Sequence, residues 1–246
     1  MIHVGTSGWQ YDSWRKRFYP RDVPKAGWLA YFSERFPTVE VNNSFYRLPS
    51  GETFSRWRRE STVKFCFAVK ASRFITHVKR LREGAEPVKL LWSRAGRLGG
   101  KRGPVLFQLP PRFRADPGRL EEFLGVLPRG LDAAFEFRDR SWETDEIYAL
   151  LDGAGAAYVL ADRPDAKVAD VVTGGWSYIR FHKGRRLSPG YPAAKLRRWA
   201  DRIAVLPARN VYVYFNNDEE GAAVRDALRL TRLLEERGQS VAGAAA

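Results

Sequence analysis

Short apolar segments alternate with longer amphipathic segments along nearly the whole chain. Eight segments are rich in Val, Phe, Tyr and Ile and show the two-residue alternation typical of β-strands; they begin at Ile2, Val39, Phe65, Val105, Ala133, Ala157, Ser177 and Val211. Apolar residues spaced as on one face of an α-helix follow most of them, in residues 26–36, 52–60, 116–127, 144–155, 192–206 and 219–238. In the third of these helices, Asp116 has the position of an N-cap and Pro117 that of the first helical residue.

The regular alternation of strands and helices predicts a parallel α/β fold. Eight such units in 246 residues have the size of a TIM (β/α)8 barrel, which we expect to form one domain over residues 1–238. The sixth unit is incomplete, because residues 162–176 are too few and too interrupted for a full helix. The sixth helix is therefore expected to be short or missing, and residues 239–246 are expected to form a frayed tail. An open, doubly wound sheet is the alternative fold.

The stretch from Val39 to Pro49, VEVNNSFYRLP, carries polar residues on one face of a predicted strand. Glu40 and Asn42 share that face, since side chains alternate along a strand. The same division recurs in other strands and predicts that large apolar side chains face the helices while polar side chains meet inside the barrel. They should gather at the carboxyl ends of the strands, where barrel enzymes have their active sites. The expected inward set is Ser7, Glu40, Asn42, Ser44, Lys70, Gln108, Glu136, Arg138, Asp162, Tyr178, Arg180, His182, Tyr214, Asn216 and Asp218. The alternative is a salt-bridge network that only fixes the register of the strands.

The composition adds a strong positive charge to this picture. The formal net charge is +14, and such a surface attracts nucleic acid, anionic lipid or phosphorylated metabolites. A single cysteine, Cys66, excludes an internal disulfide and fits a reducing compartment. No apolar run approaches the roughly 18 residues of a membrane helix, and the first residues lack the features of a signal peptide. The sequence therefore predicts a cytoplasmic protein whose partner is nucleic acid or another phosphate-bearing ligand, and no membrane.

Seven motifs occur in order along the chain and together resemble the domain-of-unknown-function 72 family, also called YecE-like. They are GTSGWQYDSWRKRFYP, VEVNNSFYRLP, FCFAVKASRFITH, GPVLFQLPP, FEFRDRSW, IRFHKG and VYFNND, from Gly5 to Asp218. The resemblance implies a TIM barrel that is distantly similar to the barrels of xylose isomerase and endonuclease IV. It implies no settled activity, although that similarity suggests a role with nucleic acid. A shared fold does not by itself establish a function.

Metal-assisted cleavage of a phosphoester is the first enzymatic hypothesis. Ligands suited to Mg²⁺ or Mn²⁺ could come from Glu40, Glu136, Asp162, His182 and Asp218. The chain has only three histidines, however, so it cannot build the histidine-rich cluster of endonuclease IV-type barrels. Of the other two, His3 is expected to be packed and His77 to be exposed in a basic loop. A divalent metal is therefore not favoured, no metal ligand is assigned, and no motif for an organic cofactor is found.

Metal-free acid–base chemistry on a small sugar-like or carboxylate substrate is the second hypothesis. Glu136 has Arg138 beside it in sequence and is expected to stay ionised. Glu40 has fewer cationic neighbours in sequence and is expected to have a raised pKa. Two carboxylates in different environments can separate the roles of acid and base. The candidate catalytic residues are Glu40, Glu136 and His182.

The sequence favours most a binding site for nucleic acid or another phosphate-bearing ligand, with processing of that ligand as an extension. Aromatic residues are interleaved with basic ones in the first loop, as in sites that stack bases beside a phosphate chain. The candidate residues for binding the substrate and its anionic groups are Lys70, Arg138, Arg180, Asn42, Gln108, Asn216, Trp9, Tyr11 and Tyr46. Further cations follow the seventh strand, where barrels often bind phosphate; they are Lys183, Arg185 and Arg186. The basic residues between 195 and 202 are expected to form a solvated helix face.

Overall fold

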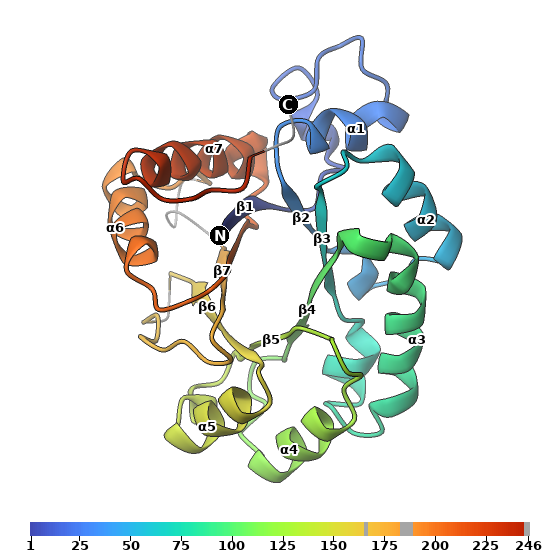
Figure 1. Ribbon diagram of the computed structural model, residues 1–246, viewed down its shortest axis with the longest axis vertical. Helices are drawn as coiled ribbons and strands as arrows, with labels where there is room; N and C mark the ends of the chain where they lie inside the picture. The colour runs from blue at the N-terminus through green and yellow to red at the C-terminus, as the bar shows by residue number, and fades with distance from the viewer. Residues whose placement is uncertain (165–166, 183–188, 244–246) are drawn as a thin grey trace.

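Eight parallel strands form a closed barrel in the order in which they occur in the chain (Figure 1). The computed structural model describes residues 1–164, 167–182 and 189–243. The strands are β1 (Ile2–Ser7), β2 (Thr38–Val41), β3 (Cys66–Lys70), β4 (Arg102–Gln108), β5 (Ala133–Glu136), β6 (Ala157–Asp162), β7 (Ser177–Phe181) and β8 (Val211–Phe215). The barrel closes because β8 pairs with β1, with Ile2 opposite Val211. The predicted TIM barrel is confirmed, and the open-sheet alternative is wrong.

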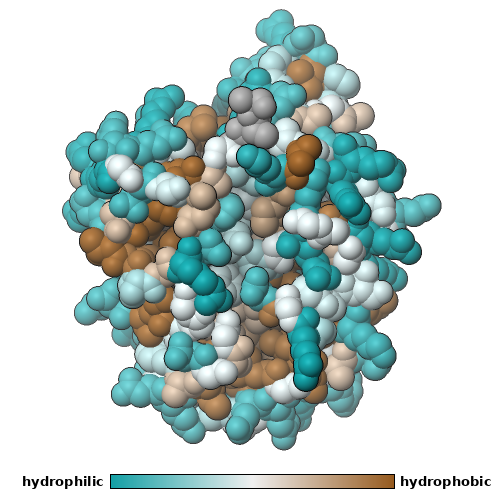
Figure 2. Space-filling view, viewed as in Figure 1, coloured by the Kyte–Doolittle hydropathy of each residue, from teal (hydrophilic) through white to brown (hydrophobic). Residues whose placement is uncertain are grey.

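Seven α-helices surround the strands in the described residues (Figure 1), and their outer surface is largely hydrophilic in the view of Figure 2. They are α1 (Trp28–Ser33), α2 (Gly51–Glu60), α3 (Ala85–Ala95), α4 (Pro117–Gly125), α5 (Asp145–Gly153), α6 (Ala193–Ala204) and α7 (Ala222–Glu235). The hydrophobic pattern predicts all of them except α3, whose buried stripe consists only of Val88, Leu91 and Ala95. Asp116 caps α4 as predicted, and its carboxylate accepts the backbone N–H of Arg119 at 3.1 Å. No helix in the described residues is long and apolar enough to span a membrane.

The sixth unit has no helix in the residues that the structure describes between β6 and β7, in agreement with the prediction. Figure 1 shows this segment at the edge of the barrel, between α5 and α6. Thr173 fixes it to the start of β6. Its hydroxyl accepts the backbone N–H of Tyr158 at 2.8 Å and donates to the carbonyl of Ala156 at 2.7 Å. Val168, Ala169 and Val171 of the same segment pack against the core, so hydrogen bonds and apolar contacts together hold this unit without a helix.

Two layers of buried side chains follow from the alternation along the strands. The outer layer joins strands to helices and contains large side chains such as Phe67, Phe107 and Phe135. The inner layer consists of Ala68, Leu106, Ala134, Ala157, Val159, Trp176, Tyr178 and Tyr214. The alanines leave space for the rings of Tyr178 and Tyr214, whose centres lie 5.1 Å apart. The predicted outward direction of the large apolar side chains is thus confirmed, and polar side chains take the inward positions nearer the carboxyl ends.

The last described residues are bonded to the first strand. The backbone N–H of Ile2 donates to the carbonyl of Ser240 at 3.0 Å, and the N–H of Ala242 donates to the carbonyl of Ile2 at 2.7 Å. The tail that the sequence predicts to fray from residue 239 is therefore tied to β1 at these two positions. Residues 244–246 lie outside the described residues.

Gly5 is required where β1 passes close to β2. A Cβ at this position would lie 2.1 Å from the carbonyl oxygen of Thr38, which is the residue opposite Gly5 in the sheet. We expect Gly5→Ala to lower the free energy of unfolding by about 1–3 kcal/mol, because the two strands must move apart to make room for the added methyl group. Urea denaturation measures this loss. Gly118→Ala is the control, because Gly118 lies in α4 with open space around it. That change should not destabilise the protein, and equal stability of the two variants would contradict the prediction.

Candidate functional site

Arg180 lies at the centre of a buried ion cluster at the carboxyl ends of the strands. Its Nη2 donates to Glu40 Oε1 at 2.7 Å, and its Nη1 donates to Glu136 Oε2 at 2.5 Å. The amide oxygen of Gln108 accepts a further hydrogen bond from Nη1 at 3.2 Å. The side chains of Arg180 and both glutamates are 0% exposed. The structure thus gathers four of the predicted site residues, but the guanidinium predicted to bind an anion is occupied by the protein's own carboxylates.

The carboxylate of Glu40 is held ionised, contrary to the expectation from the sequence. The hydroxyl of Ser7 donates to its Oε1, and the hydroxyl of Tyr178 donates to its Oε2 at 2.7 Å. Burial alone would raise the pKa of Glu40, but Arg180, Lys70 and these hydrogen bonds hold the pKa below its usual value. The predicted raised pKa is wrong, because the cations that face Glu40 come from β7 and β3, which are distant in sequence.

The carboxylate of Glu136 contacts three side chains of the ion cluster. Besides Arg180, these are Arg138, whose Nη2 lies 2.5 Å from Glu136 Oε1, and His182, whose Nε2 lies 3.2 Å from the same oxygen. Burial opposes ionisation of Glu136, but the charges of Arg180 and Arg138 and the hydrogen bond from His182 hold its pKa well below the usual value. Burial lowers the pKa of His182, so its ring is neutral near neutral pH. Its Nδ1 can then accept a hydrogen bond from the amide of Asn216, 3.4 Å away.

Lys70 gives the cluster an excess of positive charge near its rim. The side chain extends from the end of β3, and its Nζ lies 4.2 Å from the centre of the Phe45 ring. In the described part of the chain, Nζ has no hydrogen bond or ion pair. Burial and the charge of Arg180 lower the pKa of Lys70 to about 8, so the ammonium form prevails at neutral pH. With Arg138 and Arg180, the cluster holds three cations against two carboxylates.

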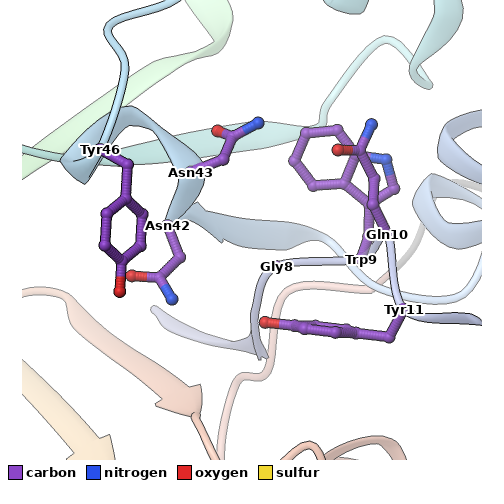
Figure 3. A pocket seen from close by; sticks show the side chains of 7 residues that line it. All are labelled: Gly8, Trp9, Gln10, Tyr11, Asn42, Asn43 and Tyr46. Carbon is purple, nitrogen blue, oxygen red and sulfur yellow. The ribbon is translucent and has the colours of Figure 1, made fainter. Parts of the chain in front are cut away.

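A pocket of about 250 Å³ lies at the mouth of the barrel, at the ends of β1 and β2. It is lined by Gly8, Trp9, Gln10, Tyr11, Asn42, Asn43 and Tyr46. Figure 3 shows the side chain of Asn42 between Tyr11 and Tyr46. Tyr46 is 81% exposed, and Asn42 Oδ1 is buried without a hydrogen-bond partner. Four residues that the sequence predicts to contact a ligand, Trp9 among them, therefore line one pocket.

Tyr11 joins this pocket to the ion cluster. Its hydroxyl donates to the backbone carbonyl of Ser7 at 2.6 Å, and the Ser7 side chain in turn donates to the cluster. Burial, together with the charge of Asp218, raises the pKa of Tyr11, so the hydroxyl stays protonated. Trp9 is only 3% exposed and packs edge-on against Trp57, with ring centres 5.0 Å apart. Trp9 thus forms a wall of the pocket and offers little free surface for stacking.

Asp162 faces away from the cluster, which corrects the predicted inward set. In β6 the inward positions belong to Val159 and Ala161, so Asp162 points towards α6. There its carboxylate accepts hydrogen bonds from Lys195 Nζ at 2.7 Å and from Trp199 Nε1 at 2.6 Å. Lys195, expected on a solvated helix face, therefore forms a partly buried ion pair.

The predicted set of metal ligands does not converge, because Asp162 lies on the outer side of the barrel. Over the described ranges, no three His, Cys, Asp or Glu side chains are arranged to hold a metal ion. His3 is packed as predicted and stacks on Tyr212 with ring centres 4.8 Å apart. The predicted phosphate-binding cations after β7 lie outside the described residues; they are Lys183, Arg185 and Arg186.

The hydrophobic pattern of the sequence does not predict that His77 and Arg163 lie near the site. His77, expected to be exposed, is half-buried, and its ring packs edge-on against Phe45 at 5.0 Å. Burial and the charge of Lys70 lower the pKa of His77, which lies on a π-helix, Phe74–Val78. Arg163 follows β6, and its charge adds to the effect of burial in lowering the pKa of Arg138. Both positions depend on loops, which hydrophobic periodicity does not describe.

The closed parallel barrel and the polar pocket at the carboxyl ends of its strands define a TIM-barrel protein with a candidate ligand site. A family model described as "Protein of unknown function DUF72" matches residues 3–246. The chain therefore belongs to the DUF72 family, and the resemblance seen in the sequence motifs is confirmed.

Similar proteins share the whole length of this fold. The UPF0759 protein YunF of Bacillus subtilis (strain 168) is 24% identical over 277 aligned residues, which cover 96% of this chain and 95% of YunF. The crystal structure of a DUF72 family protein from Thermotoga maritima MSB8 has a TM-score of 0.86 at 27% identity, covering 96% and 99% of the two chains. A DUF72 family protein from Enterococcus faecalis V583 has a TM-score of 0.82 at 19% identity, with coverage of 100% and 98%. The last likeness supports the fold alone.

Proposed function

We propose that the mouth of the barrel binds a phosphate-bearing ligand, either a nucleotide or a strand of nucleic acid. The proposal depends on the excess of cations over carboxylates in the ion cluster. The two cations nearest the rim also have unused donors: in the described residues, no hydrogen-bond partner is found for Lys70 Nζ or for Nη1 of Arg138, whose side chain is 21% exposed. A phosphate group that contacts both would balance the charge and satisfy these donors.

The pocket at the barrel mouth fits the remainder of a nucleotide, and it is linked to Lys70 through Phe45, whose ring contacts both Lys70 Nζ and Tyr46. Tyr11 and the exposed Tyr46 offer rings on which a base can stack, and stacking contributes about 1–3 kcal/mol per base. Asn42 Oδ1, which lacks a partner, can accept a hydrogen bond from an exocyclic amino group of the base. The net charge of +14 raises the local concentration of such ligands.

The test is the pH dependence of binding of a nucleoside 5′-monophosphate, measured by isothermal titration calorimetry. Because the pKa of Lys70 is about 8, the ammonium that favours the anion is present below that pH and is lost above it. We expect the affinity to fall about tenfold between about pH 7 and about pH 9. The phosphate itself contributes little to this change, because its second pKa is about 6.

Lys70→Arg is the matched control for this profile, because arginine keeps its charge throughout the range. The variant should still bind the monophosphate, and its affinity should be nearly independent of pH. The unphosphorylated nucleoside should bind the wild-type protein much more weakly than the monophosphate does. A nucleoside that binds equally well, or a wild-type affinity that does not change with pH, would contradict the proposal.

A second candidate is a metal-free acid–base enzyme for a small sugar-like or carboxylate substrate, and the lowered pKa of Lys70 favours it. Glu40 and Glu136 are held ionised. Lys70, with a pKa of about 8, is therefore better suited than either carboxylate to act as a base, and it does so in its unprotonated form, which prevails above about pH 8. Lys70→Arg separates the two functions. It should preserve binding of an anion, whereas turnover that uses Lys70 as a base should be lost.

A further inference from the structure

A second cationic site lies beside the barrel, in the unit that lacks its helix. A groove of about 610 Å³ lies between the segment after β6 and helix α6. Its lining includes five cations, namely Arg163, Lys167, Lys195, Arg198 and Arg202. Among the described residues that line the groove, Asp162 is the only carboxylate. This surface is therefore far more basic than a mixed helix face.

In the part of the chain that the structure describes, two of the five cations pair with carboxylates. Lys195 pairs with Asp162 at 2.7 Å, and Arg202 pairs with Asp170 at 3.1 Å. The other three have no ion pair with any described residue. Two of those three, Lys167 and Arg198, are exposed. Among its described residues, the groove thus presents unpaired positive charge to solvent, which suits a ligand with several negative charges.

Arg163 connects this groove to the mouth of the barrel. It follows the carboxyl end of β6, lines the groove, and contributes to the lowered pKa of Arg138 in the ion cluster. Its Nε is buried and has no hydrogen-bond partner. The three groove cations on α6 occupy positions three and four residues apart and so share one side of the helix over about 10 Å. Positive charge therefore continues from the barrel mouth outwards along α6.

We propose that the ligand is a single-stranded nucleic acid whose backbone leaves the barrel mouth and follows the groove along α6, a proposal that rests on the proposed function. A mononucleotide would occupy the mouth alone, whereas a polymer uses both sites. A single strand fits better than a duplex, because the pocket of about 250 Å³ can receive a base only when that base is unstacked from a helix. In a single strand the bases are already free to stack on aromatic side chains.

The experiment compares binding of an oligothymidylate of about 16 nucleotides with binding of thymidine 5′-monophosphate over a range of salt concentrations. The double variant Lys167→Gln/Arg198→Gln removes two exposed charges without breaking an ion pair between described residues. For the oligothymidylate, we expect the slope of log affinity against log salt to become shallower by about 1.4, since each phosphate contact on a single strand contributes about 0.7. The affinity for the monophosphate should stay unchanged.

The matched control is Lys64→Gln/Arg209→Gln, which removes the same charge from exposed residues that precede β3 and β8, at the opposite end of the barrel. It should leave the slope nearly unchanged. An equal effect of the two double variants, or an oligothymidylate affinity no greater than that of the monophosphate, would overturn the inference. The inference would also be overturned if duplex DNA or heparin bound as tightly as the oligothymidylate and lost affinity to the same extent in the Lys167→Gln/Arg198→Gln variant. Groove-dependent oligothymidylate binding without any monophosphate binding would support the groove and overturn the site proposed at the barrel mouth.

Discussion

Replacing Arg180 with methionine is expected to lower the free energy of unfolding by about 3–5 kcal/mol at neutral pH, because it removes the counter-charge that two buried carboxylates share. Arg180 is the shared partner of Glu40 at 2.7 Å and of Glu136 at 2.5 Å, and all three side chains are 0% exposed. Methionine retains much of the apolar volume but none of the charge. Urea denaturation of the variant and the wild-type protein measures the difference.

The sign of the pH dependence separates this electrostatic loss from a loss of packing. In the wild-type protein, Glu40 and Glu136 have pKa values below the ordinary 4.5. They therefore contribute stability above that pH and lose it as the pH falls through their folded-state pKa. Without Arg180, burial should raise both pKa values, so that the buried carboxyls are favourable only when protonated and cost stability as the pH rises. The deficit of the variant should consequently be large at neutral pH and shrink towards about pH 4.

Arg17→Met provides the control for the removal of one arginine charge. Arg17 lies 3.5 Å from Glu220 in a pair whose side chains are 48% and 70% exposed, and such pairs contribute at most about 1 kcal/mol. Its effect should be small at every pH. A loss in Arg180→Met that is as small, or a deficit of equal size at acidic and neutral pH, would show that the buried cluster does not depend on its central charge.

The directions of most strand side chains could be predicted because polar and apolar residues alternate clearly. In β7, Arg180 and His182 alternate with Ile179 and Phe181, and the structure turns the first pair inward and the second towards the helices. β6 lacks this contrast, because its sequence AYVLAD is apolar on both faces until the last residue. The inward direction predicted for Asp162 therefore had no support from alternation, and it is wrong.

The electrostatic environment of each charged group could not be predicted, because it is set by strands that are distant in the chain. Glu40 meets Arg180 across 140 residues of sequence, so its nearest cations are invisible in the local pattern. Loops add a second difficulty. The segment that carries His77 continues through Arg80 and Leu81, whose φ angles of 49° and 71° depart from regular structure. No periodic signal indicates that such a loop brings a histidine to the edge of the site.

The inner and outer parts of the ion cluster differ in whether they keep hydrogen-bond donors that a ligand can reach. Arg180, Glu40 and Glu136 are fully enclosed and pair with one another, as a network that fixes strand register would. Lys70 and Arg138 lie nearer the rim and keep unused donors. The two interpretations of the sequence, a structural network and a ligand site, thus describe adjacent layers of one cluster. Substitutions in the inner layer should change mainly stability, and those in the outer layer should change mainly affinity.

Arg138→Met is accordingly expected to weaken binding of a nucleoside 5′-monophosphate roughly 10- to 150-fold, since a hydrogen bond to a charged group contributes about 1.5–3 kcal/mol. The Arg138 side chain is 21% exposed, its Nη2 pairs with Glu136, and its Nη1 has no partner in the described residues. The guanidinium can therefore reach a bound phosphate while it stays anchored to the cluster. Stability should fall much less than in Arg180→Met, because Glu136 keeps its bond to Arg180. Calorimetric titration and urea denaturation of the same variant measure both effects.

Arg140→Met is the matched control, because Arg140 is an exposed arginine two residues further along the same loop. It removes the same charge without removing a donor from the ion cluster, so its effect on affinity should be limited to the long-range field, which salt screens. Arg138→Lys restores the charge but not the planar fork of donors, and it should recover only part of the affinity. If Arg138→Met and Arg140→Met weakened binding equally, the phosphate would be attracted by net charge alone, and the barrel mouth would not be its binding site.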